Sequence, residues 1–229
     1  MKDPTAGRSH SDRTRSGSQR SAPKLLRDLE IILKERVEFL RVFIKEPTRV
    51  GALSPSSQSR ARAMIHGLAL KTASTVIEIG PGTGAVTGLI LKRIGKATKF
   101  FALELNSRYS RSLKRRFPDL LVHNDSAEKL SFYLAEHGRK SAKYIISGLP
   151  WAFFDSALQE RILHAVRTSL APDGVFTTFA YVHALWMPAA RKFRRRLESG
   201  FSRVEASPVI WRNLPPAFVY RCSRVRHRG

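Results

Sequence analysis

The sequence has few of the features that stabilise secreted or membrane-spanning proteins. Its 229 residues include one cysteine, Cys222, which we take for an ordinary strand residue. No disulfide can therefore form within the chain, and the simplest expectation is a cytosolic protein. No stretch has the ~20 consecutive apolar residues that a transmembrane helix needs. Residues 1–23 are rich in Ser and Arg and lack the apolar segment of a secretory signal, which predicts a disordered basic tail.

Acidic residues are also scarce. The chain has 41 Lys and Arg residues against 18 Asp and Glu residues, which gives a formal net charge of +23. Such a surface attracts polyanions, either nucleic acid or an anionic membrane, and charge alone does not distinguish them. Hydrophobic residues make up 42% of the chain, enough for one sizeable core.

A strongly amphipathic helix of about six turns is predicted between residues 24 and 46. Its apolar residues recur every three or four positions, at Leu26, Leu29, Leu33, Val37, Leu40 and Ile44. This face either packs on the rest of the protein or lies in a membrane interface with its basic residues near lipid phosphates. Several acidic residues in the same helix weaken the second interpretation. We expect residues 24–70 to form this helix and a substrate or lid segment.

Strands and helices alternate over residues 71–229, which we expect to form the main domain. We predict strands at Thr75–Gly80, Lys99–Glu104, Leu120–Asn124, Ala142–Ser147, Val175–Tyr181, Arg203–Val209 and Ala217–Cys222, and helices at Ala85–Ile94, Arg108–Phe117, Glu128–His137, Asp155–Leu170 and Ala189–Gly200. This order predicts a doubly wound α/β fold with a seven-stranded, mainly parallel sheet. The last two strands have only a short link, which favours an antiparallel hairpin at the sheet edge.

The strongest motif is the run VIEIGPGTGAV at residues 76–86. An apolar strand leads into Gly80, Gly82 and Gly84, which allow a tight turn and close approach of a ligand to the backbone. Glu78, two positions before the first glycine, would repel a diphosphate but suits the positively charged aminoacyl end of S-adenosylmethionine. The motif therefore predicts a site for this cofactor; the alternative is a plain turn between strand and helix.

Two further carboxylates follow the next two predicted strands. Glu104 lies 20 residues after Gly84, where a carboxylate can accept hydrogen bonds from both ribose hydroxyls. Asp125 follows the third strand, where a side-chain acceptor can bind the adenine amino group. An alternative and compatible role for Asp125 is to cap the N-terminus of a helix over Ala127–His137.

The run YIISGLPWAFFDS at residues 144–156 follows the fourth strand, where the methyl acceptor must meet the cofactor. Methyl transfer needs a nucleophile held in line with the methyl–sulfur bond. Trp151, Phe153 and Phe154 could form an aromatic wall, which suits an amine that becomes cationic as it is alkylated. Alternatively these aromatic residues are core or membrane contacts.

The motifs between residues 76 and 151 resemble those of class I S-adenosylmethionine-dependent methyltransferases. Within this superfamily they are similar to the ribosomal RNA adenine dimethylases, with one departure. Those enzymes carry Asn before Leu-Pro, and its side chain holds the adenine amino group. Here that position is Gly148, preceded by Ser147, so only backbone acceptors are available.

The segment FLRVFIKEPTRVGALSPSS, the S-G-L-P run at residues 147–150 and the ending WRNLPPAFVYRC are more similar to bacterial phospholipid N-methyltransferases. This resemblance implies a peripheral enzyme on the inner face of the cytoplasmic membrane that methylates phosphatidylethanolamine toward phosphatidylcholine, with the amphipathic helix docked on anionic lipid. It implies no metal. The implied cofactor-binding residues are Glu78, Gly80, Gly82, Gly84, Glu104, Asp125 and Ser147, and the implied catalytic residues are Gly148, Trp151, Tyr181 and His183.

Several roles stay open at this level. The amine must lose a proton before it attacks, and Tyr181, His183 or a water could accept it. Arg212 could bind the lipid phosphate, or it is a solvated arginine of a basic protein. The rival hypotheses are an RNA methyltransferase, for which the basic run at residues 191–196 is the best local signal, and a lipid-binding protein that has lost catalysis.

Overall fold

The computed structural model describes residues 55–226, and the statements below refer to these residues. They belong to the compact unit Thr48–Gly229. The predicted basic tail and the predicted amphipathic helix at residues 24–46 lie outside the described residues.

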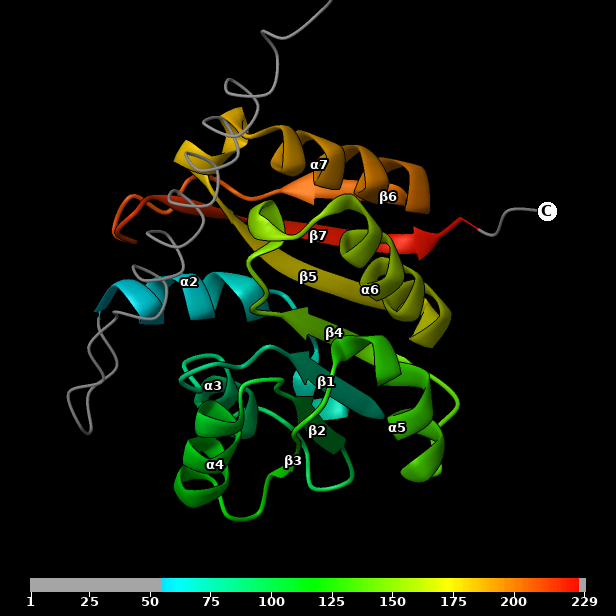
Figure 1. The fold of residues 1–229 in the computed structure, drawn as a ribbon. Coiled ribbons are helices and arrows are strands. Elements are labelled where there is room, and N and C mark those ends of the chain that lie inside the picture. Colours follow the sequence, from blue (N-terminus) through cyan, green and yellow to red (C-terminus); the bar gives the residue numbers. More distant parts are fainter. Residues whose placement is uncertain (1–54, 227–229) are drawn as a thin grey trace, which may run out of the picture. The chain divides into compact units, whose positions relative to one another are not determined.

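One seven-stranded sheet forms the centre of the described part, with the strand order β3-β2-β1-β4-β5-β7-β6 (Figure 1). The strands are β1 (Thr75–Ile79), β2 (Lys99–Leu103), β3 (Leu121–His123), β4 (Ala142–Ser147), β5 (Leu170–Tyr181), β6 (Phe201–Ala206) and β7 (Ala217–Val225). Every neighbouring pair is parallel except β5–β7 and β6–β7, so β7 is the antiparallel strand. The predicted doubly wound, mainly parallel sheet with its terminal hairpin is confirmed.

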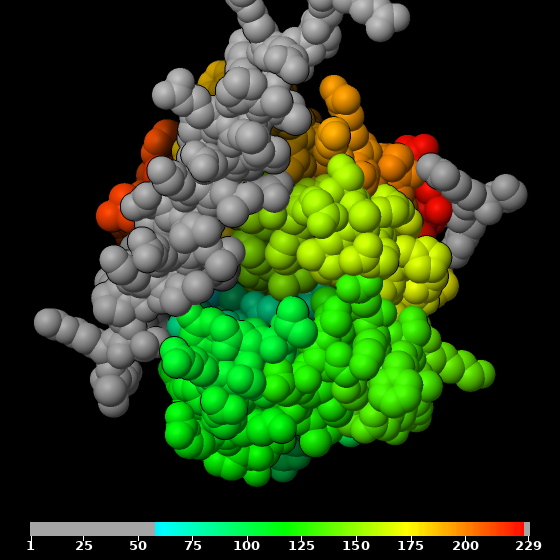
Figure 2. Space-filling model, viewed as in Figure 1, coloured from blue at the N-terminus to red at the C-terminus, as the bar shows by residue number. Residues whose placement is uncertain are grey.

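Helices join the strands and cover both faces of the sheet. The α-helices are α2 (Pro55–Ile65), α3 (Thr87–Leu91), α4 (Ser107–Arg116), α5 (Leu130–Glu136), α6 (Ser156–Ser169) and α7 (Pro188–Gly200). The short 3-10 helices are η1 (Leu70–Thr72), η2 (Ala127–Lys129), η3 (Trp151–Phe153) and η4 (Val182–Trp186). α6 packs between α5 and α7 on one face, and Figure 2 shows the green surface around α4 and α5 next to the yellow-green surface of α6.

The side chains of β7 show how the two faces differ. Tyr220 lies against Phe193 of α7, with ring centroids 6.4 Å apart. Its neighbour Arg221 points to the other face, where its guanidinium donates to the backbone carbonyl of His66 just after α2. This alternation is the two-residue period of a strand buried on both sides.

Most predicted elements agree with the structure within three residues, and β7 runs on to Val225. β5 begins at Leu170 instead of Val175, because Leu170 already pairs with Ala142 of β4; the register then shifts before Val175 pairs with Tyr144. β6 ends at Ala206, three residues before the predicted end. The helix after β1 is shorter than the predicted Ala85–Ile94. Within residues 55–226 no helix is long and apolar enough to cross a membrane.

The strand order reverses direction between β1 and β4. The connection after β1 leads to β2 on one side, whereas β4 lies on the other. In open α/β sheets a crevice forms at the carboxyl ends of the strands at this point and binds ligands. The predicted site residues lie at or just after the carboxyl ends of β1 to β5.

Candidate functional site

The glycine turn after β1 has the backbone shape that only glycine adopts readily. Gly80, Gly82 and Gly84 have φ values of 65°, 55° and 80°. A Cβ at Gly80 or Gly84 would lie within 3 Å of a neighbouring side chain, whereas a Cβ at Gly82 would have no atom within 4 Å. The turn is therefore packed at both ends and open at Gly82, as a cofactor cradle requires.

Glu78 is the acidic residue behind this turn, and it is 1% exposed. Its Oε2 accepts a hydrogen bond of 2.7 Å from the hydroxyl of Thr87. Burial, opposed in part by this hydrogen bond and reinforced by the charge of Glu104, raises the pKa of Glu78 to about 8. A cation next to such a buried acid would lower its pKa and stabilise the ionised form.

Glu104 joins the end of β2 to the glycine turn. Its Oε2 accepts from the backbone N–H of Gly82 at 2.9 Å, and its Oε1 accepts from the N–H of Asn106 at 2.8 Å. Burial raises the pKa of this carboxyl, and the two backbone hydrogen bonds oppose the increase. Each carboxylate oxygen has more than one acceptor position. Both oxygens can therefore still receive ribose hydroxyls beside Gly82.

Asp125 follows β3 and is held by two side chains that the sequence did not single out. Its Oδ2 accepts from the Nζ of Lys129 and the hydroxyl of Tyr133, both at 2.9 Å. The hydrogen bond from Lys129 is the largest cause of its lowered pKa. The alternative role of Asp125 as a helix cap is wrong: Ser126 is the N-cap of η2, and its hydroxyl accepts from the N–H of Glu128.

A histidine pair lies beside this carboxylate. The Nε2 atoms of His123 and His137 are 2.8 Å apart, and the ring of His123 stacks on Tyr133 with a centroid distance of 3.9 Å. Burial lowers the pKa of both histidines. Tyr133 and the two histidines could not be found from the sequence, because their contacts join β3 to α5.

The loop after β4 lies directly against the glycine turn. The N–H of Gly148 donates to the carbonyl of Ile79 at 2.9 Å. A Cβ at Gly148 would lie 2.3 Å from the carbonyl oxygen of Gly80. Any other residue at position 148 would therefore push two backbone segments apart.

Ser147 and Trp151 support this loop from inside the protein. The indole N–H of Trp151 donates to the hydroxyls of Ser147 and Thr178, at 3.1 and 2.9 Å. Ser147 is fully buried, and its hydroxyl also accepts from the N–H of Leu149 at 3.3 Å, so it holds the loop; its role toward the cofactor stays a prediction.

The aromatic wall differs from the expectation for Trp151. This side chain is 2% exposed and stacks on Phe193 of α7 with a centroid distance of 4.5 Å, because both of its indole hydrogen-bond partners lie in the core. Trp151 is thus a core residue at the floor of the site. Phe153 and Phe154, both half-buried, are the aromatic residues placed nearer the surface.

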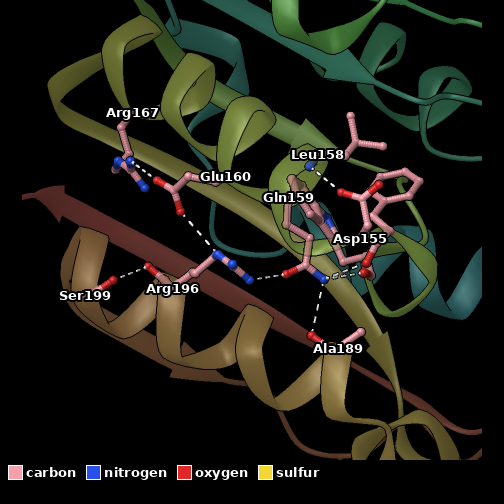
Figure 3. A network of polar contacts seen from close by, with 10 residues as sticks. Asp155, Leu158, Gln159, Glu160, Arg167, Ala189, Arg196 and Ser199 are labelled. Carbon is pink, nitrogen blue, oxygen red and sulfur yellow. Dashed lines mark hydrogen bonds and ion pairs between the residues drawn. The ribbon is translucent and has the colours of Figure 1, made fainter.

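Gln159 is a buried residue of α6 that fixes the η3 turn, and sequence reasoning missed it. Its amide nitrogen donates to the carbonyls of Trp151 and Ala189 at 2.7 and 3.2 Å (Figure 3). Its oxygen accepts from Arg196 of α7 at 2.8 Å. One amide thereby joins the loop after β4 to both helices of this face.

Tyr181 and His183 lie at the carboxyl end of β5. The hydroxyl of Tyr181 accepts a hydrogen bond of 2.9 Å from Arg60 of α2, whose guanidinium lies 4.7 Å from the ring centroid of Phe179. The rings of Tyr181 and His183 stack at 5.5 Å, and burial lowers the pKa of His183. Tyr181 also lines a small apolar pocket with Pro150, Phe153 and Leu185. The structure thus brings both candidate bases to the edge that carries the Gly148 loop.

No family model matches the chain. Ornithine lipid N-methyltransferase from Singulisphaera acidiphila is 29% identical over 197 residues, which cover 85% of this chain and 98% of that protein. Ribosomal RNA small subunit methyltransferase A from Acidobacterium capsulatum is 29% identical over 131 residues, 56% of this chain but only 43% of that protein.

The structure is similar to solved methyltransferases. The O-methyltransferase from Bacillus cereus in complex with SAH has a TM-score of 0.59 at 13% identity, with 84% of this chain and 90% of that chain covered. The chain has the class I S-adenosylmethionine-dependent methyltransferase fold, and the comparisons support S-adenosylmethionine as its cofactor.

Proposed function

From this fold and cofactor, we propose that the chain methylates the amine of a membrane lipid, and that the acceptor is phosphatidylethanolamine. The observation that carries the proposal is the similarity to a lipid N-methyltransferase over nearly the whole of that relative and 85% of this chain. The excess of positive charge agrees with a substrate in an anionic membrane.

The residues of the site suit the bound cofactor. Glu104 is hydrogen-bonded to Gly82 and would accept the ribose hydroxyls, and the buried Glu78, on the strand that leads into the turn, would balance the cationic aminoacyl end. S-adenosylmethionine supplies a methyl group bonded to a positively charged sulfur. When bound, it would supply this methyl group for in-line transfer to the lipid amine, with the electron pair of the broken carbon–sulfur bond staying on sulfur.

The chain must orient the amine and accept one proton from it. The backbone of the Gly148 loop, which lies against the glycine turn, would orient the amine, and proximity in line with the breaking bond would supply much of the rate. Burial keeps the pKa of His183 below its ordinary value, so its ring is neutral near pH 7 and able to accept the proton. Tyr181 and a water stay alternative bases.

Ornithine lipid is a second candidate acceptor, because the relative that the chain matches along most of its length is named for it. Ornithine also carries a primary amine, and the same chemistry applies. The closeness of Gly148 to Gly80 argues against the ribosomal RNA adenine alternative, because the asparagine of those enzymes would place its Cβ 2.3 Å from a backbone oxygen here.

The test is a competition with radiolabelled S-adenosylmethionine. The full chain is incubated with vesicles containing phosphatidylethanolamine, vesicles containing ornithine lipid, and naked ribosomal RNA, and each fraction is counted. We expect label in phosphatidylethanolamine. Label in ornithine lipid alone would show that ornithine lipid, and not phosphatidylethanolamine, is the acceptor. Label in RNA alone would refute the lipid proposal.

A further inference from the structure

Two exposed tips of the domain carry large apolar side chains. Trp186 in η4 is 86% exposed, and Leu185 beside it is 37% exposed. In the link between β6 and β7, Trp211 is 71% and Leu214 is 74% exposed. We call these four residues the apolar tips. Exposed apolar groups of this size mark surfaces that contact a membrane or another molecule.

Both tips lie at the edge of the sheet that carries the site. β5 ends at Tyr181 and leads directly into η4. β7 begins at Ala217, which pairs with Tyr181, and the N–H of Val182 donates to the carbonyl of Pro216 at 2.9 Å. The two tips therefore leave the sheet side by side, at the carboxyl edge of β5 beside the candidate acceptor site.

The second tip is a fixed turn with its polar residue turned inward. Asn213 is fully buried, and its side-chain nitrogen donates to the carbonyl of Pro215 at 2.6 Å. The N–H of Asn213 donates to Ile210, which in turn donates to Ala217. Turns usually expose Asn and bury Leu or Trp. Here the hydrogen bonds of the turn keep Asn213 buried and leave Trp211 and Leu214 exposed, so their exposure is a property of the folded turn.

The surroundings of the tips are cationic. Residues 174–197 and 206–229 contain no Asp or Glu. Arg191 and Lys192 follow η4 in the first turns of α7, and Arg212 lies between the two apolar residues of the second tip; all three are exposed. Within residues 55–226, none of them forms an ion pair. Trp beside Lys or Arg is the composition that the interface of an anionic bilayer favours.

We propose that the apolar tips insert into the interfacial layer of an anionic membrane, with Arg191, Lys192 and Arg212 against lipid phosphates. The inserted edge then faces the bilayer with the Gly148 loop and Tyr181, so a lipid amine reaches the site without leaving the membrane. The inference deepens the proposed function and relies on it for the substrate. It gives the folded domain a membrane contact of its own.

Binding to vesicles tests the tips directly. The full-length double variant Trp186→Ser/Trp211→Ser is compared with the wild type on vesicles of phosphatidylethanolamine and phosphatidylglycerol. We expect its partition coefficient to fall by at least about tenfold, because two indoles no longer bury apolar area in lipid. The matched control is Phe132→Ser, which removes a 61% exposed aromatic from α5, and should bind as the wild type does. Unchanged affinity for S-adenosylmethionine in both variants shows that they are folded.

Tryptophan fluorescence gives a second readout that does not depend on affinity. The chain has three tryptophans, and Trp151 is buried. On vesicles, emission of the wild type should shift to shorter wavelength and be quenched by lipids brominated on their acyl chains. The double variant, which retains Trp151, should show neither effect.

The outcomes separate this inference from the proposed function. Equal vesicle binding by the double variant and the wild type, or no quenching by brominated lipid, would overturn it. Loss of ribosomal RNA binding with vesicle binding intact would also overturn it and make the tips a nucleic-acid surface, since exposed aromatics stack on bases. If the tips prove necessary for vesicle binding but no lipid is methylated, the inference stands and the proposed function fails.

Discussion

At the scale of single residues, Glu78 is the group whose protonation should respond most to pH and to the bound cofactor. It is an acid enclosed by the core and hydrogen-bonded to Thr87, and its burial raises its pKa to about 8. Without a cation beside it, the proton stays on at neutral pH. A bound sulfonium and ammonium would favour loss of that proton. We therefore expect cofactor binding and the protonation of Glu78 to be coupled.

The first prediction concerns stability against pH. The folded protein keeps the Glu78 proton to about pH 8, whereas the unfolded chain releases it near the ordinary value of 4.5. The stabilising contribution is thus full below the ordinary pKa and lost as the pH rises through about 8. Relative to Glu78→Gln, the wild type should lose on the order of 3–5 kcal/mol of unfolding free energy by about pH 9. Urea unfolding of the cofactor-free proteins measures this, and parallel curves would contradict it.

The second prediction concerns Glu104. Glu104→Ala removes the acceptor for the Gly82 N–H and the expected acceptor for the ribose hydroxyls. Affinity for S-adenosylmethionine should fall about 10- to 100-fold, since hydrogen bonds to charged groups contribute roughly 1.5–3 kcal/mol. Calorimetry measures it, with Glu205→Ala on the edge strand β6 as the control. Unchanged affinity would remove the ribose assignment.

The third prediction concerns Gly148. In Gly148→Ala the new Cβ meets the Gly80 carbonyl at 2.3 Å, a backbone atom that has little room to move. We expect a loss of about 1–3 kcal/mol in stability and a larger loss of methyl transfer, because the loop and the glycine turn separate. Gly88→Ala in α3, whose Cβ would find only ordinary contacts from 3.6 Å, should be neutral or slightly stabilising in thermal unfolding. Equal behaviour of the two variants would disprove the steric argument.

At the scale of elements, α6 holds the acceptor loop through Gln159. Gln159→Leu keeps the volume but leaves the carbonyl of Trp151 and the guanidinium of Arg196 without this partner. As the fourth prediction, kcat should fall severalfold while affinity for S-adenosylmethionine is retained, and stability should drop by about 1–3 kcal/mol. Arg194→Ala, which breaks an exposed ion pair on α7, is the control. An equal loss of cofactor affinity would show a general structural role instead.

The sequence predicted the elements well where apolar runs and glycines are decisive. β1, the glycine turn after it and the antiparallel hairpin of β6 and β7 follow from local pattern. The burial of Trp151 does not, because it depends on Phe193 and Thr178, which come from α7 and β5. The roles of Gln159 and Tyr133 were missed for the same reason: their partners are distant in sequence and meet only when the helices pack.

At the scale of the whole molecule, the net charge of +23 dominates. As the fifth prediction, binding to vesicles with anionic lipid should weaken steeply between low and physiological salt, because ions screen surface charges within about 8–10 Å. Vesicles of neutral lipid should show a small salt effect, since the apolar contacts are not screened. Sedimentation measures both, and salt-independent binding to anionic vesicles would contradict the electrostatic part of the account.

Deletion of residues 24–46 distinguishes the membrane contact predicted for this helix from the one proposed for the apolar tips. We expect this variant to bind anionic vesicles more weakly than the full chain and to retain affinity for S-adenosylmethionine, since the glycine turn and both site carboxylates lie in the described domain. Loss of cofactor affinity would instead favour the interpretation in which the helix packs on the domain.

The most direct measurement is a calorimetric titration of the full chain with S-adenosylmethionine and with its demethylated product. We expect one site per chain for each ligand, with both affinities lowered by Glu104→Ala. If neither ligand binds, the open position at Gly82 does not hold the cofactor, and the lipid and RNA alternatives fail together.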